Sequence, residues 1–144
     1  MSYVQKPENV SDNARVTDIA CVYGNARVSD NAHVSDNAYV SGDARVSGNA
    51  CVSGDARVSG NACVSGDACV SGNADILVIG PAISSGRYTT AHTDTNIGVR
   101  VNTGCFSGSV QEFIDAIERT HKDNAVALRQ YRGFVAAIKA HFGL

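Results

Sequence analysis

The densest group of chemically capable side chains lies in one short segment, residues 87–102. It contains two arginines, a tyrosine, a histidine and an asparagine: Arg87, Tyr88, His92, Arg100 and Asn102. Guanidinium groups make bidentate contacts with phosphate, and a tyrosine ring offers a flat surface for stacking. Together these residue types predict a binding site for a small anion. Taken singly, each also suits a solvated strand, a core position or a turn.

A second chemical pattern is the spacing of His33, Cys51 and Cys69, which follow one another at intervals of 18 residues. Imidazole and thiolate groups bind metals, so stacking of these residues would make a metal column. Cysteine is also a small, soft residue that fills interfaces, and buried thiols are the alternative. The five cysteines lack CxxC spacing, which predicts neither a disulfide framework nor a zinc knuckle. Cys105 could serve as a nucleophile, but no partner residue is identified for it.

Composition limits the partners that the chain can have. The 144 residues carry a formal charge of -2, which argues against general nucleic-acid binding. No apolar run approaches the length of roughly 18 residues that spans a bilayer, and the first residues do not resemble a secretory signal. We therefore expect no membrane partner and a cytoplasmic location.

A hexapeptide repeat must position these side chains. Residues 10–75 divide into eleven consecutive hexapeptides of the kind VSGDAR or VSGNAC. Where two hexapeptides join, the sequence Ala-x-Val is typical of a short strand, with Ala and Val pointing inward and x pointing outward. The following Ser-[Gly/Asp]-[Asn/Asp] is typical of a corner, because Gly, Asn and Asp tolerate unusual backbone angles. Alternating strands and corners predict a solenoid.

An aliphatic residue first and a small residue fifth, repeated in sixes, resembles the hexapeptide-repeat superfamily. This resemblance implies a mainly β fold, a left-handed parallel β-helix with three hexapeptides per coil, over residues 1–81. It also implies a homotrimer. The superfamily includes acyltransferases, γ-class carbonic anhydrases, binding proteins and structural or assembly proteins, so the fold alone does not decide the activity. Only His33 lies on the repeats, which argues against the carbonic anhydrase, whose site needs several histidines.

With three hexapeptides per coil, residues 18 apart stack at about the 4.8 Å spacing of neighbouring strands. The corner residues Asn25, Asp43 and Asn61 then alternate in charge up one column, which keeps carboxylates apart and lets Asn donate to Asp. The outward residues fall on three faces. These are Arg15, His33, Cys51 and Cys69; Cys21, Tyr39, Arg57 and Asp75; and Arg27, Arg45 and Cys63. On the second face, Arg57 and Asp75 could form an ion pair.

The regular pattern ends at Pro81, and residues 82–144 read as a different unit. Alternating apolar residues around a polar centre predict a β-hairpin that turns near residues 94–98. Ser109 and Glu112 form a capping box ahead of a helix that ends near His121, and a second helix begins near Asp123. We expect the hairpin and the two helices to cap the open end of the solenoid.

The tail also resembles that of small uncharacterised phage and bacterial proteins in the pattern "NTGCFSGS…EF…TH…Y", over residues 104–142. This resemblance implies a phage protein in the host cytoplasm and makes a nucleotide one conceivable ligand.

The sequence as a whole predicts a non-enzymatic, trimeric binding or interaction protein without a cofactor. The predicted protein sequesters a small anionic or nucleotide ligand between subunits through Arg87, Tyr88, His92, Arg100 and Asn102. One alternative is an acyltransferase that uses acetyl-CoA or another acyl-CoA, with His92 as the general base. The other is a rigid structural or assembly protein.

Overall fold

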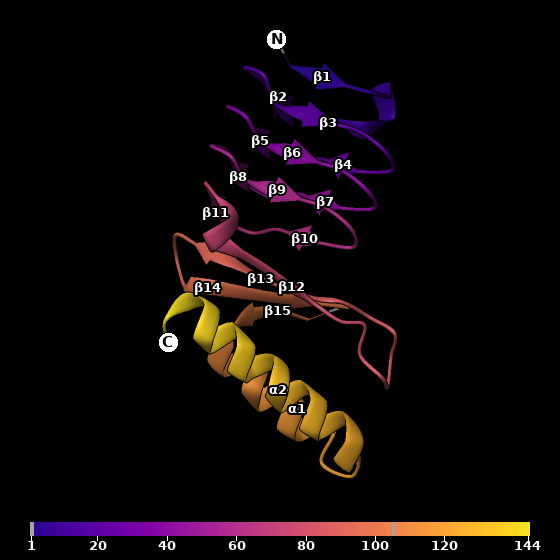
Figure 1. Cartoon of the computed structure of the whole chain (residues 1–144), viewed down its shortest axis with the longest axis vertical. Helices are drawn as coiled ribbons and strands as arrows, with labels where there is room; N and C mark the ends of the chain where they lie inside the picture. Colours follow the sequence, from indigo (N-terminus) through magenta and orange to yellow (C-terminus); the bar gives the residue numbers. More distant parts are fainter. Residues whose placement is uncertain (1, 105) are drawn as a thin grey trace.

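Three layers follow one another from the N-terminus to the C-terminus in the computed structural model, which describes residues 2–104 and 106–144 (Figure 1). A stack of parallel coils comes first, an antiparallel sheet lies across its lower end, and two helices cover the far side of that sheet. The described chain holds no helix with the length and hydropathy needed to cross a membrane.

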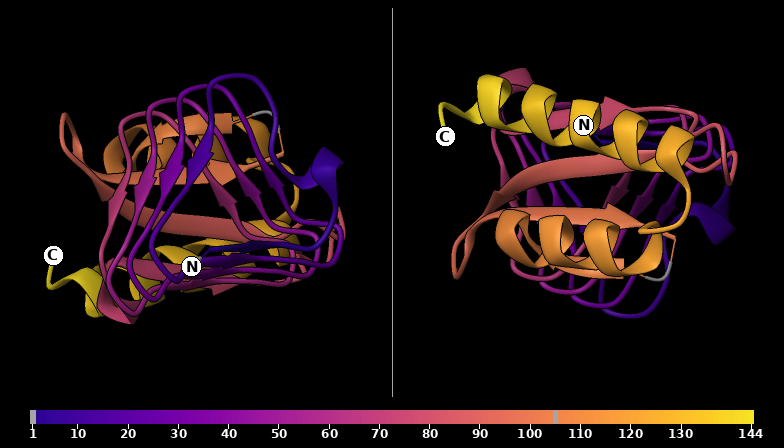
Figure 2. Two further views of the ribbon diagram at one scale, coloured as in Figure 1. Left: turned by 90° about the horizontal axis from the view of Figure 1, so that it is seen from above. Right: turned by 90° about the horizontal axis from the view of Figure 1, so that it is seen from below.

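The coils are built from two-residue strands that pair in parallel. The strands are β1 (Tyr3–Val4), β2 (Arg15–Val16), β3 (Cys21–Val22), β4 (Arg27–Val28), β5 (His33–Val34), β6 (Tyr39–Val40), β7 (Arg45–Val46), β8 (Cys51–Val52), β9 (Arg57–Val58), β10 (Cys63–Val64) and β11 (Cys69–Val70), with 3-10 turns η1 (Pro7–Asn9) and η2 (Asn73–Asp75). They form three sheets, in the orders β1-β3-β6-β9, β10-β7-β4 and β11-β8-β5-β2. Partners such as Val16 and Val34 are 18 residues apart, which confirms three hexapeptides per coil. Seen from above, the coils superpose (Figure 2).

The interior of the coils contains the Val and Ala side chains of the repeat, as predicted. From Ala20 to Val70 these side chains are at most 2% exposed. The corners require the left-handed backbone region, which Asp30 (φ 58°) and Gly48 (φ 67°) both adopt. Each is the third residue of its hexapeptide, which explains why only Asp or Gly occupies that place throughout the repeats.

The corner amides and carboxylates stack as predicted. Asn25 donates to Asp43, Asn37 to Asp55 and Asn49 to Asp67, each over 3.2 Å. In these columns, at the fourth position of the repeat, a carboxylate thus has an amide donor as its neighbour, and repulsion between carboxylates is avoided. At the third position Asp12 and Asp30 do stack, and there the Asp12 carboxylate accepts from the backbone nitrogen of Asp30 over 3.4 Å.

The last coil is covered by a four-stranded antiparallel sheet, which we call the cap sheet. Its strands are β12 (Ile76–Ile79), β13 (Thr89–Asp94), β14 (Gly98–Thr103) and β15 (Phe106–Ser109), in that spatial order. The predicted hairpin is confirmed as β13 and β14, with its turn between Asp94 and Gly98. The chain adds an outer strand on each side of it, and β12 joins this sheet rather than the parallel coils.

Helices α1 (Val110–Thr120) and α2 (Ala125–Phe142) pack on the other face of the cap sheet (Figures 1 and 2). The predicted capping box is present: Glu112 N donates to Ser109 Oγ, and Ser109 N donates to Glu112 Oε2, each over 3.2 Å. Beneath the helices lies a second apolar core. Its buried members are Ala82, Ala91, Val101, Val110, Phe113, Ile117, Ala127, Tyr131, Phe134 and Ile138.

Candidate functional site

His92 and Asn102 lie between the cap sheet and the last coil, where both are buried. Asn102 Nδ2 lies 3.0 Å from His92 Nε2 and 3.0 Å from the carbonyl oxygen of Cys63. Ser65 Oγ donates to Asn102 Oδ1 over 3.2 Å, and Ser65 N lies 3.4 Å from His92 Nε2. These two side chains therefore satisfy polar groups that the last coil would otherwise leave without strand partners.

The surroundings of His92 hold its ring in the neutral form. Its Nδ1 lies 2.9 Å from the carbonyl oxygen of Thr93, which can only accept, so Nδ1 carries the proton and Nε2 accepts. Burial lowers the pKa of His92, because removal from water disfavours the charged ring. Both nitrogens are engaged inside the protein, so this geometry gives no support to His92 as the base of an acyltransferase.

Arg100 links strands of the cap sheet and packs against a corner of the coils. Its Nε donates to Asp94 Oδ2 over 2.7 Å, and its Nη1 donates to Ser107 Oγ over 3.1 Å. Its guanidinium lies against the corner at Gly66, where a Cβ atom would come within 2.6 Å of Nε. Arg100 is thus committed to a buried carboxylate and to a glycine corner of the coil.

Several contacts of the cap sheet involve residues that sequence reasoning had not singled out. Thr90 Oγ1 accepts from Cys63 N over 3.0 Å, and Thr93 donates to the carbonyl oxygen of Cys69. The signal that could have found part of this face is the alternation in "TTAHTD", because Thr90, His92 and Asp94 point one way along a strand while Ala91 points to the helices.

Three of the five predicted site residues line a cleft instead. Arg87, Tyr88 and Asn102 border a cavity of about 530 Å³ at the junction of coils and cap sheet. The coils contribute one basic, one amide and one thiol side chain. The full lining is Arg45, Asn61, Cys63, Gly86, Arg87, Tyr88, Asn102, Thr103 and Gly104. We call this cavity the arginine cleft.

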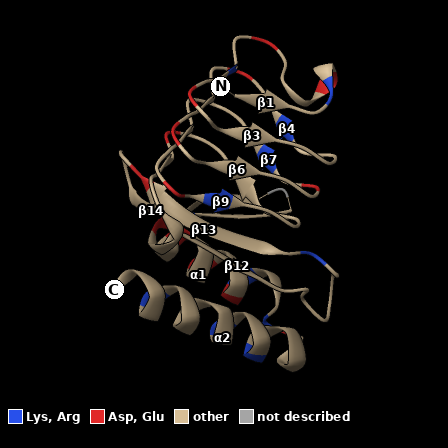
Figure 3. Cartoon of the chain, turned by 45° about the horizontal axis from the view of Figure 1, so that its top comes forward, with Lys and Arg blue, Asp and Glu red and all other residues tan. Residues whose placement is uncertain are grey.

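The two arginines of the arginine cleft form no ion pair with any residue that the structure describes. Among residues 2–104 and 106–144, the only ion pairs are Arg100–Asp94 and Arg132–Glu118, so neither Arg45 nor Arg87 has a carboxylate within 4.0 Å. Arg27 stacks beside Arg45 in register on the same face, where Figure 3 shows basic segments on both β4 and β7. A groove of about 450 Å³ continues along that face, where Asp43 lines it beside Arg27 and Arg45.

Two further features prepare the arginine cleft for an anion. The Arg87 guanidinium lies over Gly104 (φ 54°), where a Cβ atom would come within 2.1 Å of Nη1. Burial raises the pKa of the Cys63 thiol, although Arg45 opposes this shift. The thiol is therefore neutral at neutral pH and adds no negative charge to the lining.

The predicted column of His33, Cys51 and Cys69 does share one face, in register on β5, β8 and β11. His33 Nε2 lies 2.9 Å from Thr17 Oγ1. Burial and the neighbouring Cys69 raise the pKa of Cys51. No group of three or more His, Cys, Asp or Glu with metal-binding geometry occurs in the part of the chain that the structure describes. Cys105 lies outside the described residues.

The second face contains Cys21, Tyr39 and Arg57 as predicted, but Asp75 makes other contacts. Asp75 Oδ2 accepts from both the backbone and the hydroxyl of Ser71, over 3.0 and 2.8 Å. Arg57 lies over the ring of Tyr39, 5.4 Å from its centroid. The turn η2 takes Asp75 out of the parallel ladder, so the possible ion pair does not form.

Comparison with known proteins supports the repeat architecture. The family described as the YdcK beta solenoid repeat matches residues 20–36, 38–54, 44–60, 50–66 and 56–72. All five matches fall on the coils, and none reaches β12 or the cap sheet. No curated protein and no solved structure matches the chain. The family match and the stacked coils agree that the N-terminal half is similar to a repetitive β-helix.

Proposed function

We propose that the protein binds a small anion, with phosphate as the reference chemistry, in the arginine cleft. One observation carries the proposal. Arg45 from the coils and Arg87 from the loop before β13 line the same cavity, and neither has a carboxylate partner among the described residues. Two guanidinium groups suit phosphate because each offers a planar pair of donors. The Asn61 amide adds donor capacity and Tyr88 adds a ring surface.

This proposal changes the composition of the predicted site. Arg87, Tyr88 and Asn102 remain in it, whereas His92 and Arg100 hold the cap sheet. Arg45, Asn61 and Cys63 join it from the repeats. The proposed function is binding, and it requires no catalytic step.

Titration of the protein with inorganic phosphate, followed by ³¹P NMR, tests the proposal. We expect saturable binding that weakens at least tenfold in Arg45→Gln and in Arg87→Gln. Arg15→Gln is the matched control, because Arg15 lies on a different face of the coils. Equal binding by all four proteins, or no saturable binding by the wild type, would show that the arginine cleft is not an anion site.

We also propose that the chain is a homotrimer of the hexapeptide-repeat superfamily. The uninterrupted three-hexapeptide coils support this, because their stacked strands form flat outer faces on which further subunits can pack. Native mass spectrometry of the purified protein gives the subunit number directly, and a monomer at micromolar concentration would contradict the proposal. A phage origin and a location in the host cytoplasm stay predictions from the resemblance of the tail.

A further inference from the structure

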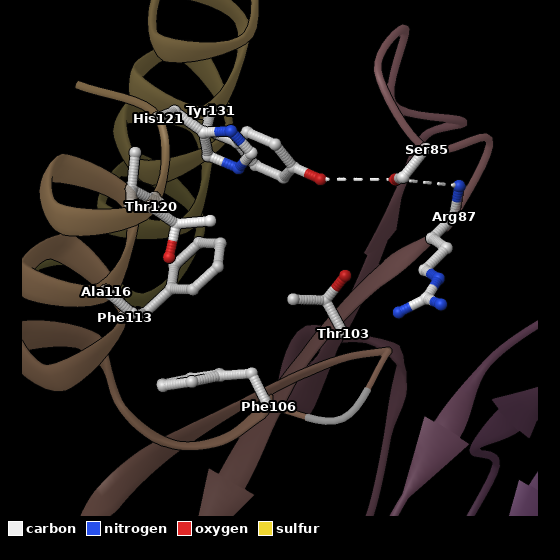
Figure 4. Close-up of a pocket in the computed structure, with 10 residues that line it drawn as sticks. Ser85, Arg87, Thr103, Phe106, Phe113, Ala116, Thr120, His121 and Tyr131 are labelled. Atoms are coloured by element: carbon white, nitrogen blue, oxygen red, sulfur yellow. Dashed lines mark hydrogen bonds between the residues drawn. The ribbon is translucent and has the colours of Figure 1, made fainter. Parts of the chain in front are cut away.

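A second cavity adjoins the arginine cleft and shares Arg87 and Thr103 with it. Its volume is about 270 Å³, and most of its exposed lining is apolar. Figure 4 shows residues of α1 and α2 on one side, Ser85 and Arg87 of the loop before β13 on the other, and Thr103 and Phe106 below them. The full lining is Ser85, Arg87, Thr103, Phe106, Phe113, Ala116, Ile117, Thr120, His121 and Tyr131. We call it the aromatic cleft.

Rings form much of the wall of the aromatic cleft. His121 stacks on Tyr131, with ring centroids 5.0 Å apart and an angle of 15° between the planes. Phe113 meets Tyr131 edge to face at 6.2 Å, and Phe106 lies 5.5 Å from Phe113. Such a wall offers both ring faces and ring edges, which favour another flat ring over a flexible chain.

Hydrogen bonds connect the aromatic cleft to Arg87. The Tyr131 hydroxyl lies 3.4 Å from Ser85 Oγ, and that oxygen accepts from the backbone nitrogen of Arg87 over 3.3 Å (Figure 4). A third contact, from Ile83 N to Gln130 Oε1 over 2.6 Å, joins the same loop to α2. The loop that carries Arg87 is therefore fixed to the helix that carries Tyr131.

We infer that the ligand is an aromatic phosphate, whose phosphate lies between Arg45 and Arg87 and whose ring enters the aromatic cleft. This inference rests on the proposed anion site and adds the class of ligand. Arg87 lines both the positively charged arginine cleft and the apolar aromatic cleft. One molecule with an anionic group and a flat apolar ring can therefore fill both cavities. The smaller volume suits one ring system and would not admit a folded partner.

Binding of three probes tests the inference: inorganic phosphate, 1-naphthyl phosphate and hexyl phosphate. We expect 1-naphthyl phosphate to bind at least tenfold more tightly than either of the other two. Ala116→Phe should abolish that preference by filling the aromatic cleft, while the affinity for inorganic phosphate stays within twofold of the wild type. Ala136→Phe is the control, because Ala136 is exposed on α2 and lines neither cavity.

The outcomes separate the two proposals. Equal affinity for the three probes, all lost in Arg45→Gln, would overturn the aromatic ligand and retain the anion site. Tighter binding of hexyl phosphate than of 1-naphthyl phosphate would replace the ring with an alkyl chain. If 1-naphthyl phosphate binds to Arg45→Gln and to Arg87→Gln as tightly as to the wild type, or if no probe binds, both proposals fail.

Discussion

Asn102 donates from Nδ2 to Nε2 of His92 over 3.0 Å, between neighbouring strands of the cap sheet and against the last coil. The same amide also reaches the carbonyl oxygen of Cys63 and accepts from Ser65. A solenoid of this kind ends in backbone groups with no further coil to pair with. Side chains of the cap sheet replace that missing coil, which explains why polar residues are buried here.

Asn102→Leu should lower the stability of the protein. The change keeps the approximate size of the side chain but leaves the Cys63 carbonyl, the Ser65 hydroxyl and His92 Nε2 without this partner. We expect a loss of about 1–3 kcal/mol in the free energy of unfolding, the usual cost of a buried polar group left unpaired. Urea unfolding measures it. Asn13→Leu is the control, because Asn13 is exposed and should change stability by no more than about 0.5 kcal/mol. Equal losses in both variants would contradict the capping role of Asn102.

Neutral His92 should make stability depend on pH. Its pKa in the folded protein is lowered from the ordinary 6.5, so the unfolded chain binds the proton more readily. The stabilisation is therefore complete above about pH 6.5 and falls as the pH drops towards the folded-state pKa. Free energies of unfolding at about pH 7.5 and pH 5.5 would show this loss. The loss should shrink in His92→Gln and persist in His141→Gln, since His141 is exposed. An unchanged pH dependence in His92→Gln would rule out His92 as its source.

Cys63 provides a reporter for the arginine cleft. Its thiol is partly buried with a raised pKa, so iodoacetamide should modify it more slowly than the exposed Cys69. Phosphate in the cleft should slow Cys63 further, by at least threefold, and leave Cys21 on another face unchanged. Peptide mapping by mass spectrometry gives the separate rates. If phosphate slows the modification of Cys21 and Cys63 equally, the protection is a general effect of the salt and does not report binding in the cleft.

Much of the fold could be predicted because the period of the repeat determines the geometry of the coils. A period of six residues with Val and Ala inward determines which residues are 18 apart, and the three faces followed from that arithmetic. The helices were predictable from local signals, namely the Ser109–Glu112 box and the apolar spacing. Strands β12 and β15 were not, because their four residues each gain stability only by pairing with the hairpin.

The candidate site was only partly predictable. Arg87 and Tyr88 were expected, and their partner Arg45 is 42 positions away in the chain, so only the docking of the cap brings them together. His92 was misleading because its residue type suits catalysis as well as a buried polar contact. Whether His92 is exposed or buried depends on which face of β13 packs on the coils. The sequence alone does not determine this.

The alternation of Asn and Asp in the corners predicts a further effect on stability. Asn49 donates to Asp67 and accepts from Asn31 in its column. Asn49→Asp would place a carboxylate directly above Asp67 and remove that donor, at a cost of about 1 kcal/mol at low salt. Because Asn49 is exposed and Asp67 is half-buried, added salt at about 1 M should restore much of the loss. Thermal melting at low and high salt measures both quantities. Asn31→Asp is the matched control, since its column neighbours Asn13 and Asn49 are amides. If both variants melt alike and salt affects neither, repulsion between stacked carboxylates is not what the alternation avoids.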